Sequence, residues 1–305
     1  MLWVIGGKVQ ILILDKETRV QTIDARANVN LGAPDVLAAV TPKVPSQSSA
    51  SPRTFGADYV LGAPQRPSIK FDNGFLDKFK RRRATTSDYL ALAKWKAKLE
   101  IAEALRSDLT DATAAYRHFL EGSGQKRTFS YERYVQNDQS GRLTLQNAII
   151  DIQDGAEEVW AAAPSLENFN ITGGAISCGG SSRQFPYPAT ENWQKAIGGH
   201  VIWLSGKVSV SKDRSGKAQF RMDVTIHAED RYNFNPDQHD IATGIPDSDN
   251  GNFEVSGLGN QYDQAGTLNR NVRWERGKLP SSSVGLAGSR RQRMPGQNRR
   301  LRNRL

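Results

Sequence analysis

The chain has 305 residues, of which 38% are hydrophobic and 24% charged, and its net charge is +9. This length allows one large domain or two smaller ones with a real core, and the composition is that of a soluble chain rather than a wholly disordered one. The longest apolar runs, such as residues 2–5 and 11–14, are far shorter than the roughly 20 residues that cross a bilayer, so no transmembrane segment is predicted. Neither a signal peptide nor an internal disulfide is predicted, because no basic region precedes an apolar stretch and Cys178 is the single cysteine.

The positive charge is concentrated in two short segments. Residues 279–305 hold seven arginines and no acid, and residues 78–83 hold five lysines and arginines. Without these charges the rest of the chain is slightly negative. Blocks of like charge are typical of disordered tails, so residues 279–305 are predicted to be one. The alternative is a segment that binds anions, but the tail has no aromatic side chains to stack on bases, and nucleic acid is therefore not the favoured partner.

The N-terminal part reads as a hairpin followed by a linker. Residues 2–5 and 8–14 are apolar strand candidates joined by Gly6 and Gly7, a pair that suits a tight turn. This defines a hairpin region at residues 1–32. Residues 33–85 contain six prolines among Ser, Gly and Ala and are predicted to be an irregular linker, with a domain boundary near residue 85.

Three helices are predicted next. The first begins with Thr86 or Ser87 as its cap and carries an apolar stripe that would face the core; the stripe consists of Leu90, Trp95, Leu99, Ala102 and Leu105. The second spans residues 109–121 and ends at Gly122 and Gly124. The third spans residues 143–162.

Strand patterns dominate the remainder. Residues 200–211 and 219–227 alternate with a period of two, and residues 213–216 supply a turn between them. Residues 253–255 and 271–274 are further strand candidates. Helices followed by strands predict an α+β domain over residues 86–278, in which a helical segment precedes a mostly antiparallel, curved sheet or half-barrel.

The candidate site follows the strand at residues 219–227. Asp230, Tyr232, Asn233 and His239 fall within ten residues, and polar groups at a strand exit can converge because the sheet fixes the base of the loop. The alternative is an ordinary turn, since Asp, Asn and Pro are common turn residues.

This stretch resembles the signature of colicin M-type bacteriocins, which reads Asp, any residue, Tyr, Asp, five residues, His, Arg. Asp230, Tyr232 and His239 match it in identity and spacing, whereas Asn233 replaces the Asp and Asp240 replaces the Arg. The segment 117–127 is similar to the family's helix that ends in a His, aromatic, Leu and Gly-x-Gly pattern. The similarity covers roughly residues 110–276.

The resemblance implies an antibacterial toxin that hydrolyses lipid II, the undecaprenyl-pyrophosphate carrier of peptidoglycan, between the lipid and the pyrophosphate, with Mg²⁺. Asp230 would hold the metal or orient the water, His239 would exchange the proton, and Tyr232 would orient the phosphate or pack. Asp230 and Asp240 are the implied metal ligands. The protein would be secreted or injected, would act in the periplasm of a target cell, and would have an immunity protein or a delivery apparatus as a partner.

The two departures from the signature matter chemically. Asn233 has no charge and accepts no proton at neutral pH, and Asp240 repels a pyrophosphate where Arg would attract it. Compensation could come from a rearranged magnesium site, formed by Asp237, Asp240, Asp247 and Asp249, and from a cation supplied by Arg221, Arg231, Arg270, Arg273 or Arg276. The alternative function is a non-catalytic binding or structural module of the same fold, such as a particle component.

Other reactive side chains have structural interpretations. His118 lies on an apolar helix, and His200 and His227 belong to strands without metal-ligand spacing. Cys178 is a possible nucleophile, but no neighbouring residue in the sequence identifies a base for it.

Overall fold

The computed structural model describes residues 56, 58–180, 182–236 and 247–279, and it gives the backbone alone for residue 249 and for four short strands. These strands are β1 (Leu2–Ile5), β2 (Lys8–Ile13), β3 (Gln21–Asp24) and β11 (Ser283–Leu286). β1 pairs with β2 in antiparallel register, and β3 adds a third strand that the sequence did not predict.

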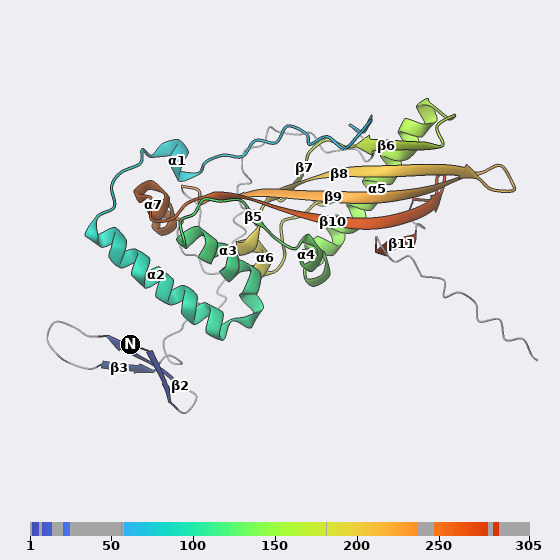
Figure 1. Ribbon diagram of the computed structural model, residues 1–305. Helices are drawn as coiled ribbons and strands as arrows, with labels where there is room; N and C mark the ends of the chain where they lie inside the picture. The colour runs from blue at the N-terminus through green and yellow to red at the C-terminus, as the bar shows by residue number, and fades with distance from the viewer. Residues whose placement is uncertain are drawn as a thin grey trace, which may run out of the picture.

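Within the described residues, the main sheet has eight strands (Figure 1). Its centre is formed by the long strands β8 (His200–Lys212), β9 (Ala218–Tyr232) and β10 (Tyr262–Glu275), which pair antiparallel. The remaining strands are β4 (Val60–Leu61), β5 (Arg127–Thr128), β6 (Asn168–Thr172), β7 (Ile176–Cys178) and β11. Only the β5–β10 pair is parallel among them. The predicted α+β class with a mostly antiparallel sheet is confirmed, and the sheet is open rather than closed.

The β8–β9 hairpin shows why these residues form long strands. Alternate residues of β9 are buried along the strand, which is the pattern of a sheet covered on one face. The predicted turn lies between the two strands: Asp213 Oδ1 accepts hydrogen bonds from the backbone N–H groups of Ser215 and Lys217 at 2.8 and 3.0 Å. Gly216 occupies the left-handed region with φ of 81°, a conformation that glycine adopts without a steric penalty.

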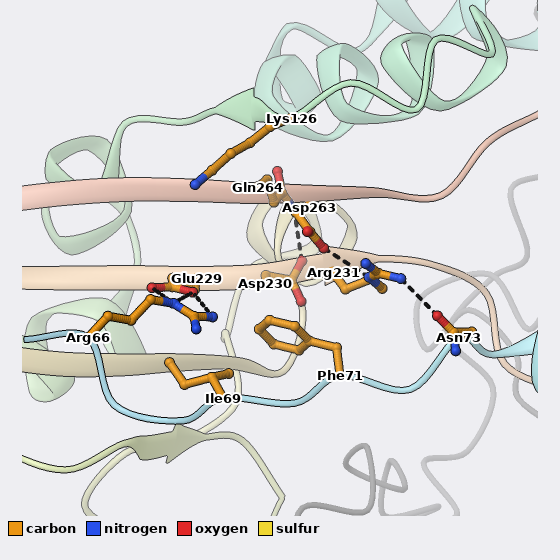
Figure 2. Close-up of a pocket in the computed structure, with 10 residues that line it drawn as sticks. All are labelled: Arg66, Ile69, Phe71, Asn73, Lys126, Glu229, Asp230, Arg231, Asp263 and Gln264. Carbon is orange, nitrogen blue, oxygen red and sulfur yellow. Dashed lines mark hydrogen bonds and ion pairs between the residues drawn. The ribbon is translucent and has the colours of Figure 1, made fainter.

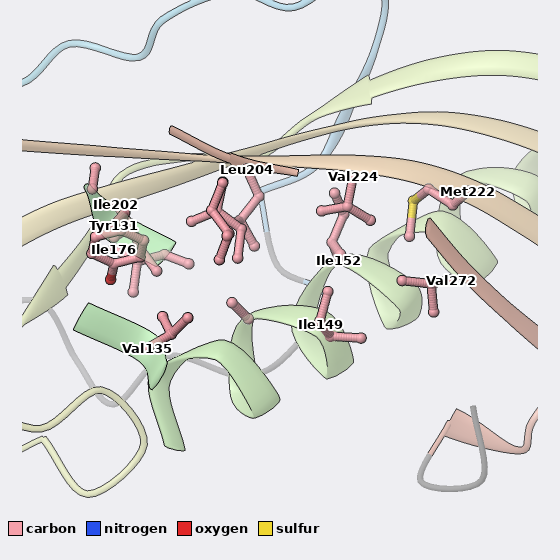
Figure 3. Packing of buried hydrophobic residues seen from close by; sticks show 14 of the residues in the cluster. Tyr131, Val135, Ile149, Ile152, Ile176, Ile202, Leu204, Met222, Val224 and Val272 are labelled. Carbon is pink, nitrogen blue, oxygen red and sulfur yellow. The ribbon is translucent and has the colours of Figure 1, made fainter. Parts of the chain in front are cut away.

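The main core lies between this sheet and α5 (Gln139–Ala162). Figure 3 shows Ile149 and Ile152 of the helix facing Leu204, Val224 and Met222 of the strands. The helix begins at Asp138, whose carboxylate accepts from the N–H groups of Ser140 and Gly141, as an N-cap residue does. This face of the sheet is therefore held by apolar packing along most of its length.

A second, smaller core lies at the other end of the strands. It contains Leu99, Phe119, Leu120, Phe253 and Tyr262, which are all buried. The helices that supply it are α2 (Thr86–Leu105), α3 (Thr110–Leu120) and α7 (Ser248–Ser256). The other described helices are α1 (Phe75–Lys78), η1 (Ser107–Leu109), α4 (Tyr131–Asn137) and α6 (Glu191–Ala196). None of the helices that the structure describes is both long and apolar enough to span a membrane.

Three details of the predicted elements are wrong. Residues 253–255 lie in the helix α7 rather than in a strand; Gly257 ends this helix in the left-handed region with φ of 74°, and Phe253 packs in the second core. The predicted core stripe of α2 is only partly buried, because Leu90 and Leu105 are 68% and 55% exposed. The helix begins one residue earlier than predicted, with Thr85 and Asp88 forming a capping box.

Part of the predicted linker packs against the sheet. β4 pairs with β6, and the Tyr59 hydroxyl donates to Asp151 Oδ2 at 2.8 Å. Residues 62–73 then cross the face of the sheet that α5 leaves open, and Arg66 reaches Glu229 on β9. The domain boundary near residue 85 stays a prediction.

Candidate functional site

A pocket of about 550 Å³ lies where residues 66–73 cross the ends of β9 and β10. Figure 2 shows the crossing segment on one side of the strands and Lys126 on the other. The residues that line the pocket are Arg66, Ile69, Phe71, Asn73, Lys126, Glu229, Asp230, Arg231, Asp263 and Gln264. The pocket therefore contains the first residue of the predicted signature, together with residues that the sequence did not connect to it.

Three cationic side chains line this pocket, and two of them are paired. Arg66 donates to both oxygens of Glu229, with Nη2 at 2.7 Å from Oε2, and this hydrogen-bonded pair keeps the pKa of Glu229 below its usual value against the effect of burial. Arg231 donates to Asp263 at 2.9 Å and to the Asn73 side chain at 2.8 Å.

Lys126 is the third cation. It is exposed and forms no ion pair with any residue that the structure describes. An ammonium group in this position can bind a phosphate oxygen without first breaking an ion pair.

Asp230 lies at the boundary between the pocket and the helix-covered interior. It lines the pocket, but it is only 7% exposed. Because side chains alternate along a strand, its carboxylate points to the face opposite those of Glu229 and Arg231. There Oδ2 accepts a hydrogen bond from Gln264 Nε2 at 2.9 Å, and the same amide donates to the Ala196 carbonyl at 2.7 Å.

This environment changes how Asp230 titrates. Burial raises the pKa of the Asp230 carboxyl to about 7, and the hydrogen bond from Gln264 offsets only part of that effect. Desolvation disfavours the charged form of an acid, and no cation among the described residues pairs with this one. At neutral pH the carboxyl can therefore both hold and release a proton.

Tyr232 has a packing role in this structure. Its ring stacks on Tyr262 with centroids 5.1 Å apart and planes 7° apart, and it also contacts Phe119 and Phe234. Burial raises the pKa of the Tyr232 phenol well above its usual value. Of the two roles that the sequence suggested, orienting phosphate or packing, these contacts correspond to packing.

Asn233 is joined to the crossing segment. Its Nδ2 donates to the carboxylate of Asp72 at 2.6 Å and to the Asp72 carbonyl at 3.1 Å. A carboxylate at position 233 would place two like charges at this distance, so the amide matches its partner. Gly74 lets the two segments approach, because a Cβ there would lie 2.0 Å from the Phe234 carbonyl oxygen.

A second buried acid lies close to Asn233. Glu254 of α7 is 1% exposed, and its Oε1 accepts from the Phe234 N–H at 3.1 Å, while its Oε2 has no hydrogen-bond partner among the described residues. Burial raises the pKa of Glu254 to about 8. The backbone that follows Tyr232 is thus held by a side chain that the sequence did not single out.

The other signature positions lie outside the described residues. These are His239 and Asp240; Asp237, considered for a rearranged magnesium site, also lies outside the described residues. Within the part of the chain that the structure describes, no group of three or more His, Cys, Asp and Glu residues could hold a metal ion. The Mg²⁺ site at Asp230 and Asp240 therefore stays a prediction.

Comparisons with known proteins add little to this picture. No protein-family model matches the chain, and no curated protein matches it either. One solved structure, that of PaeM, a colicin M-like bacteriocin produced by Pseudomonas aeruginosa, matches with a TM-score of 0.32 and 16% identity over 54% of this chain and 51% of that one. The match is distant. The chain spans about half the length of that relative, and similarity at this level does not support an argument about the site.

The remaining reactive side chains have structural partners. The His200 ring is buried and hydrogen-bonded to the Tyr131 hydroxyl at 3.0 Å, and burial lowers the pKa of His200 to about 4. His227 stacks on Trp203 at 3.6 Å. His118 contacts Tyr262 and the Gln125 carbonyl. Cys178 is fully buried, and burial raises the pKa of its thiol.

Of the five arginines considered as compensating cations, only Arg231 lies at the pocket. Arg270 is bound to Glu132, Arg221 and Arg273 lie opposite each other farther along β9 and β10, and Arg276 lies over the Trp160 ring. Sequence reasoning missed Arg66, Lys126 and Gln264. The one available signal was Lys126, which lies within the segment 117–127 that carries the family resemblance.

Proposed function

We propose that this chain is an antibacterial effector that hydrolyses lipid II or a closely similar polyprenyl-diphosphate substrate, on the lipid side of the diphosphate. The observation that carries the proposal is Asp230, a carboxyl with a pKa of about 7 in the wall of a pocket that also contains Arg66, Lys126 and Arg231. Perturbed acids beside a pocket are typical of catalytic sites. The match of Asp230, Tyr232 and His239 to the colicin M signature supports the same assignment.

The chemistry assigns a role to each group. The diphosphate binds at Lys126, and Arg66 and Arg231 can add hydrogen bonds to it by exchanging their present partners Glu229 and Asp263. Asp230 takes a proton from the attacking water as the water oxygen bonds to phosphorus and the bond from phosphorus to the lipid oxygen breaks. The departing lipid oxygen then takes up a proton, so the products are the polyprenol and the diphosphate-linked saccharide. A pKa near the working pH suits a group that exchanges a proton in this way.

The replacement of Asp by Asn233 is compatible with this proposal. Asp72 supplies a carboxylate 2.6 Å from the Asn233 amide, next to the place where the signature has its own acid. His239 and Asp240 belong to the proposed site by sequence alone, and Mg²⁺ is its expected cofactor. We further propose that the protein is secreted or injected and acts in the periplasm of a target cell, with an immunity protein or delivery apparatus as a partner.

The test is incubation of the purified full chain with lipid II in the presence of Mg²⁺. Release of polyprenol and of the pyrophosphoryl disaccharide-peptide, separated by chromatography and identified by mass, supports the proposal. EDTA should abolish the release and added Mg²⁺ should restore it. Intact lipid II after prolonged incubation at high protein concentration would overturn the proposal.

A second candidate function is the non-catalytic binding module. The observation that favours it is the direction of the Asp230 carboxylate, which is 7% exposed and held by Gln264 on the helix-covered face. The same assay separates the two functions when binding is measured beside turnover. A chain that binds lipid II and leaves it intact is a binding module.

A further inference from the structure

The helix α2 carries an unusual set of exposed side chains. On its inner face, Leu99 is buried and Trp95 packs against the second core. On the outer face, Leu90 and Leu105 are 68% and 55% exposed, and Figure 1 shows the helix along the outer edge of the fold with α3 on one side. A helix with apolar residues on both sides is typically covered on both sides. Among the described residues, nothing covers the outer side of α2, where Leu90 and Leu105 lie.

The charges before and in the first part of α2 are mostly basic, whereas Glu100 and Glu103 lie farther along the helix toward Leu105. Residues 78–98 contain eight lysines and arginines and one acid, Asp88. That acid is already engaged, because it binds Arg82 at 2.6 Å and takes part in the capping box with Thr85. The strongly basic stretch runs from the end of α1 through the first three turns of α2.

Apolar and basic side chains are interleaved on one surface. Lys94 and Lys98 follow Leu90 at spacings of four and eight residues, which places all three on neighbouring turns of one side of the helix. We name the following set, exposed on this side of α2 or in the segment before it, the basic apolar surface: Phe79, Lys80, Arg81, Arg83, Leu90, Lys94, Lys98 and Leu105. Lysine and arginine around exposed leucine and aromatic residues are typical of helices that lie in a membrane interface.

We propose that the basic apolar surface docks on a bilayer that contains anionic phospholipids. The cations bind the negative headgroups, and Leu90 and Leu105 enter the boundary between headgroups and acyl chains. Nucleic acid matches the charge equally well but gives no role to exposed leucines, which lie on the same face as the lysines. Charge and apolar area together therefore select the lipid surface.

The segment that begins this surface directly follows the wall of the candidate pocket along the chain. Asn73, which lines the pocket, is followed directly by α1 and then by the basic residues. Docking would hold the pocket close to the headgroup layer, where a lipid-linked diphosphate lies. This link to a substrate rests on the proposed function, whereas the docking itself does not.

The test is co-sedimentation of the full chain with vesicles that contain no lipid II. One vesicle population consists of phosphatidylcholine alone and the other also contains phosphatidylglycerol. We expect binding to the anionic vesicles and little to the neutral ones. Because the arginine-rich segment 279–305 is present in every variant, its contribution is the same throughout.

Matched substitutions identify the surface. Lys94→Gln should weaken binding about fivefold, since a basic residue near an anionic surface contributes ~1 kcal/mol, and Leu90→Gln should weaken it about tenfold through loss of apolar transfer. The controls are Lys207→Gln on β8 and Leu143→Gln on α5; both residues are exposed and lie outside the surface, and both variants should bind as the unmodified chain does. Circular dichroism and thermal unfolding check that the variants fold.

Three outcomes would overturn the proposal. Equal binding of Leu90→Gln and the unmodified chain would mean that charge alone drives the association. A dimer that Leu90→Gln converts to a monomer, without vesicles, would assign the face to a second copy. Binding of an RNA or DNA oligonucleotide that Lys94→Gln weakens, without binding to vesicles, would assign it to nucleic acid. Because no lipid II is present, failure here leaves the hydrolysis proposal to its own assay.

Discussion

The two ends of β9 perform different tasks on the same face of the sheet. Toward the β8–β9 turn, the inward side chains are Phe220, Met222, Val224 and Ile226, all buried against the main core. Toward the other end the same alternation places the carboxyl of Asp230 inside, with Glu254 also buried nearby. Burying an acid without a paired cation lowers the free energy of unfolding, whereas burying an apolar side chain raises it. The comparison indicates that the first end stabilises the fold, whereas the second end contains the buried acids of the proposed site.

The largest expected effect comes from a substitution in the main core, at the end of β9 near the β8–β9 turn. Ile152→Ala removes a fully buried side chain between α5 and the sheet and should lower the free energy of unfolding by about 2–5 kcal/mol, through lost transfer and the cavity left behind. Urea denaturation measures it. The control Val60→Ala, at a position 63% exposed, should change the free energy by less than about 0.5 kcal/mol. Equal effects of the two substitutions would show that the main core is misplaced.

The second prediction concerns Asp230, where a substitution should raise the free energy of unfolding instead of lowering it. The folded-state pKa of Asp230 is about 7, whereas its ordinary value is 3.8. Between these pH values the folded chain keeps the proton that the unfolded chain has lost, so the free energy of unfolding falls as the pH rises through this window. The loss amounts to up to about 4 kcal/mol, at 1.36 kcal/mol for each unit of pKa shift.

Asp230→Asn removes this loss, because the amide does not ionise and still offers an oxygen to Gln264. The variant should match the unmodified chain near about pH 4 and exceed its stability near about pH 8. Glu254 has a raised pKa of about 8 and contributes a slope in the same direction, but it is present in both proteins and cancels in the difference. An unchanged pH dependence in the variant would contradict the assigned environment of Asp230.

The third prediction tests whether Lys126 of the pocket binds the diphosphate. Lys126→Ala should raise KM for lipid II about tenfold and lower kcat little, because an exposed lysine that binds the diphosphate acts mainly on ground-state binding. Steady-state kinetics of lipid II cleavage separate the two constants. Lys207→Ala, which removes an exposed lysine of β8 outside the pocket, should leave both constants unchanged. A tenfold fall in kcat at constant KM would assign Lys126 to the transition state instead.

The smallest expected effect concerns the N-terminal cap of α2, a helix of the second core. Thr85→Ala removes the side-chain oxygen that accepts from the Asp88 N–H and should cost about 1 kcal/mol of unfolding free energy. Thr85→Ser keeps the capping oxygen and should cost much less. Thermal unfolding of both variants measures the difference, and equal losses would mean that the methyl group, not the cap, carries the effect.

Much of the fold could be predicted because its strands carry a regular pattern. The alternation in residues 200–211 and 219–227 and the turn at residues 213–216 correspond to β8, β9 and the observed turn. The glycines after Glu121 likewise mark the end of α3. Residues 253–255 were assigned to the wrong element because three residues, Phe253, Glu254 and Val255, are too few to separate a strand period from a helix period.

The site was only partly predictable. The sequence placed Asp230 and Tyr232 in a loop after the strand at residues 219–227, whereas β9 continues to Tyr232 and contains both. No periodicity in residues 62–73 indicates that Arg66 and Asp72 fold back on β9. The position of Gln264 depends on the register of β10, in which Gln264 lies opposite Asp230, and register is set by packing that the sequence of one strand does not reveal. Tyr232 was predicted as a site residue, and its stacking on Tyr262 depends on the same register.

We propose that Asp230, near the end of β9, takes part in hydrolysis of a lipid-linked diphosphate. The most direct measurement compares turnover of lipid II by two isosteric variants of that strand, Asp230→Asn and Asp223→Asn; Asp223 is exposed and lies outside the pocket. We expect a fall of at least about 100-fold for Asp230→Asn and an unchanged rate for Asp223→Asn. Turnover of Asp230→Asn at the rate of the unmodified chain, with its fold intact, would rule out this role of Asp230.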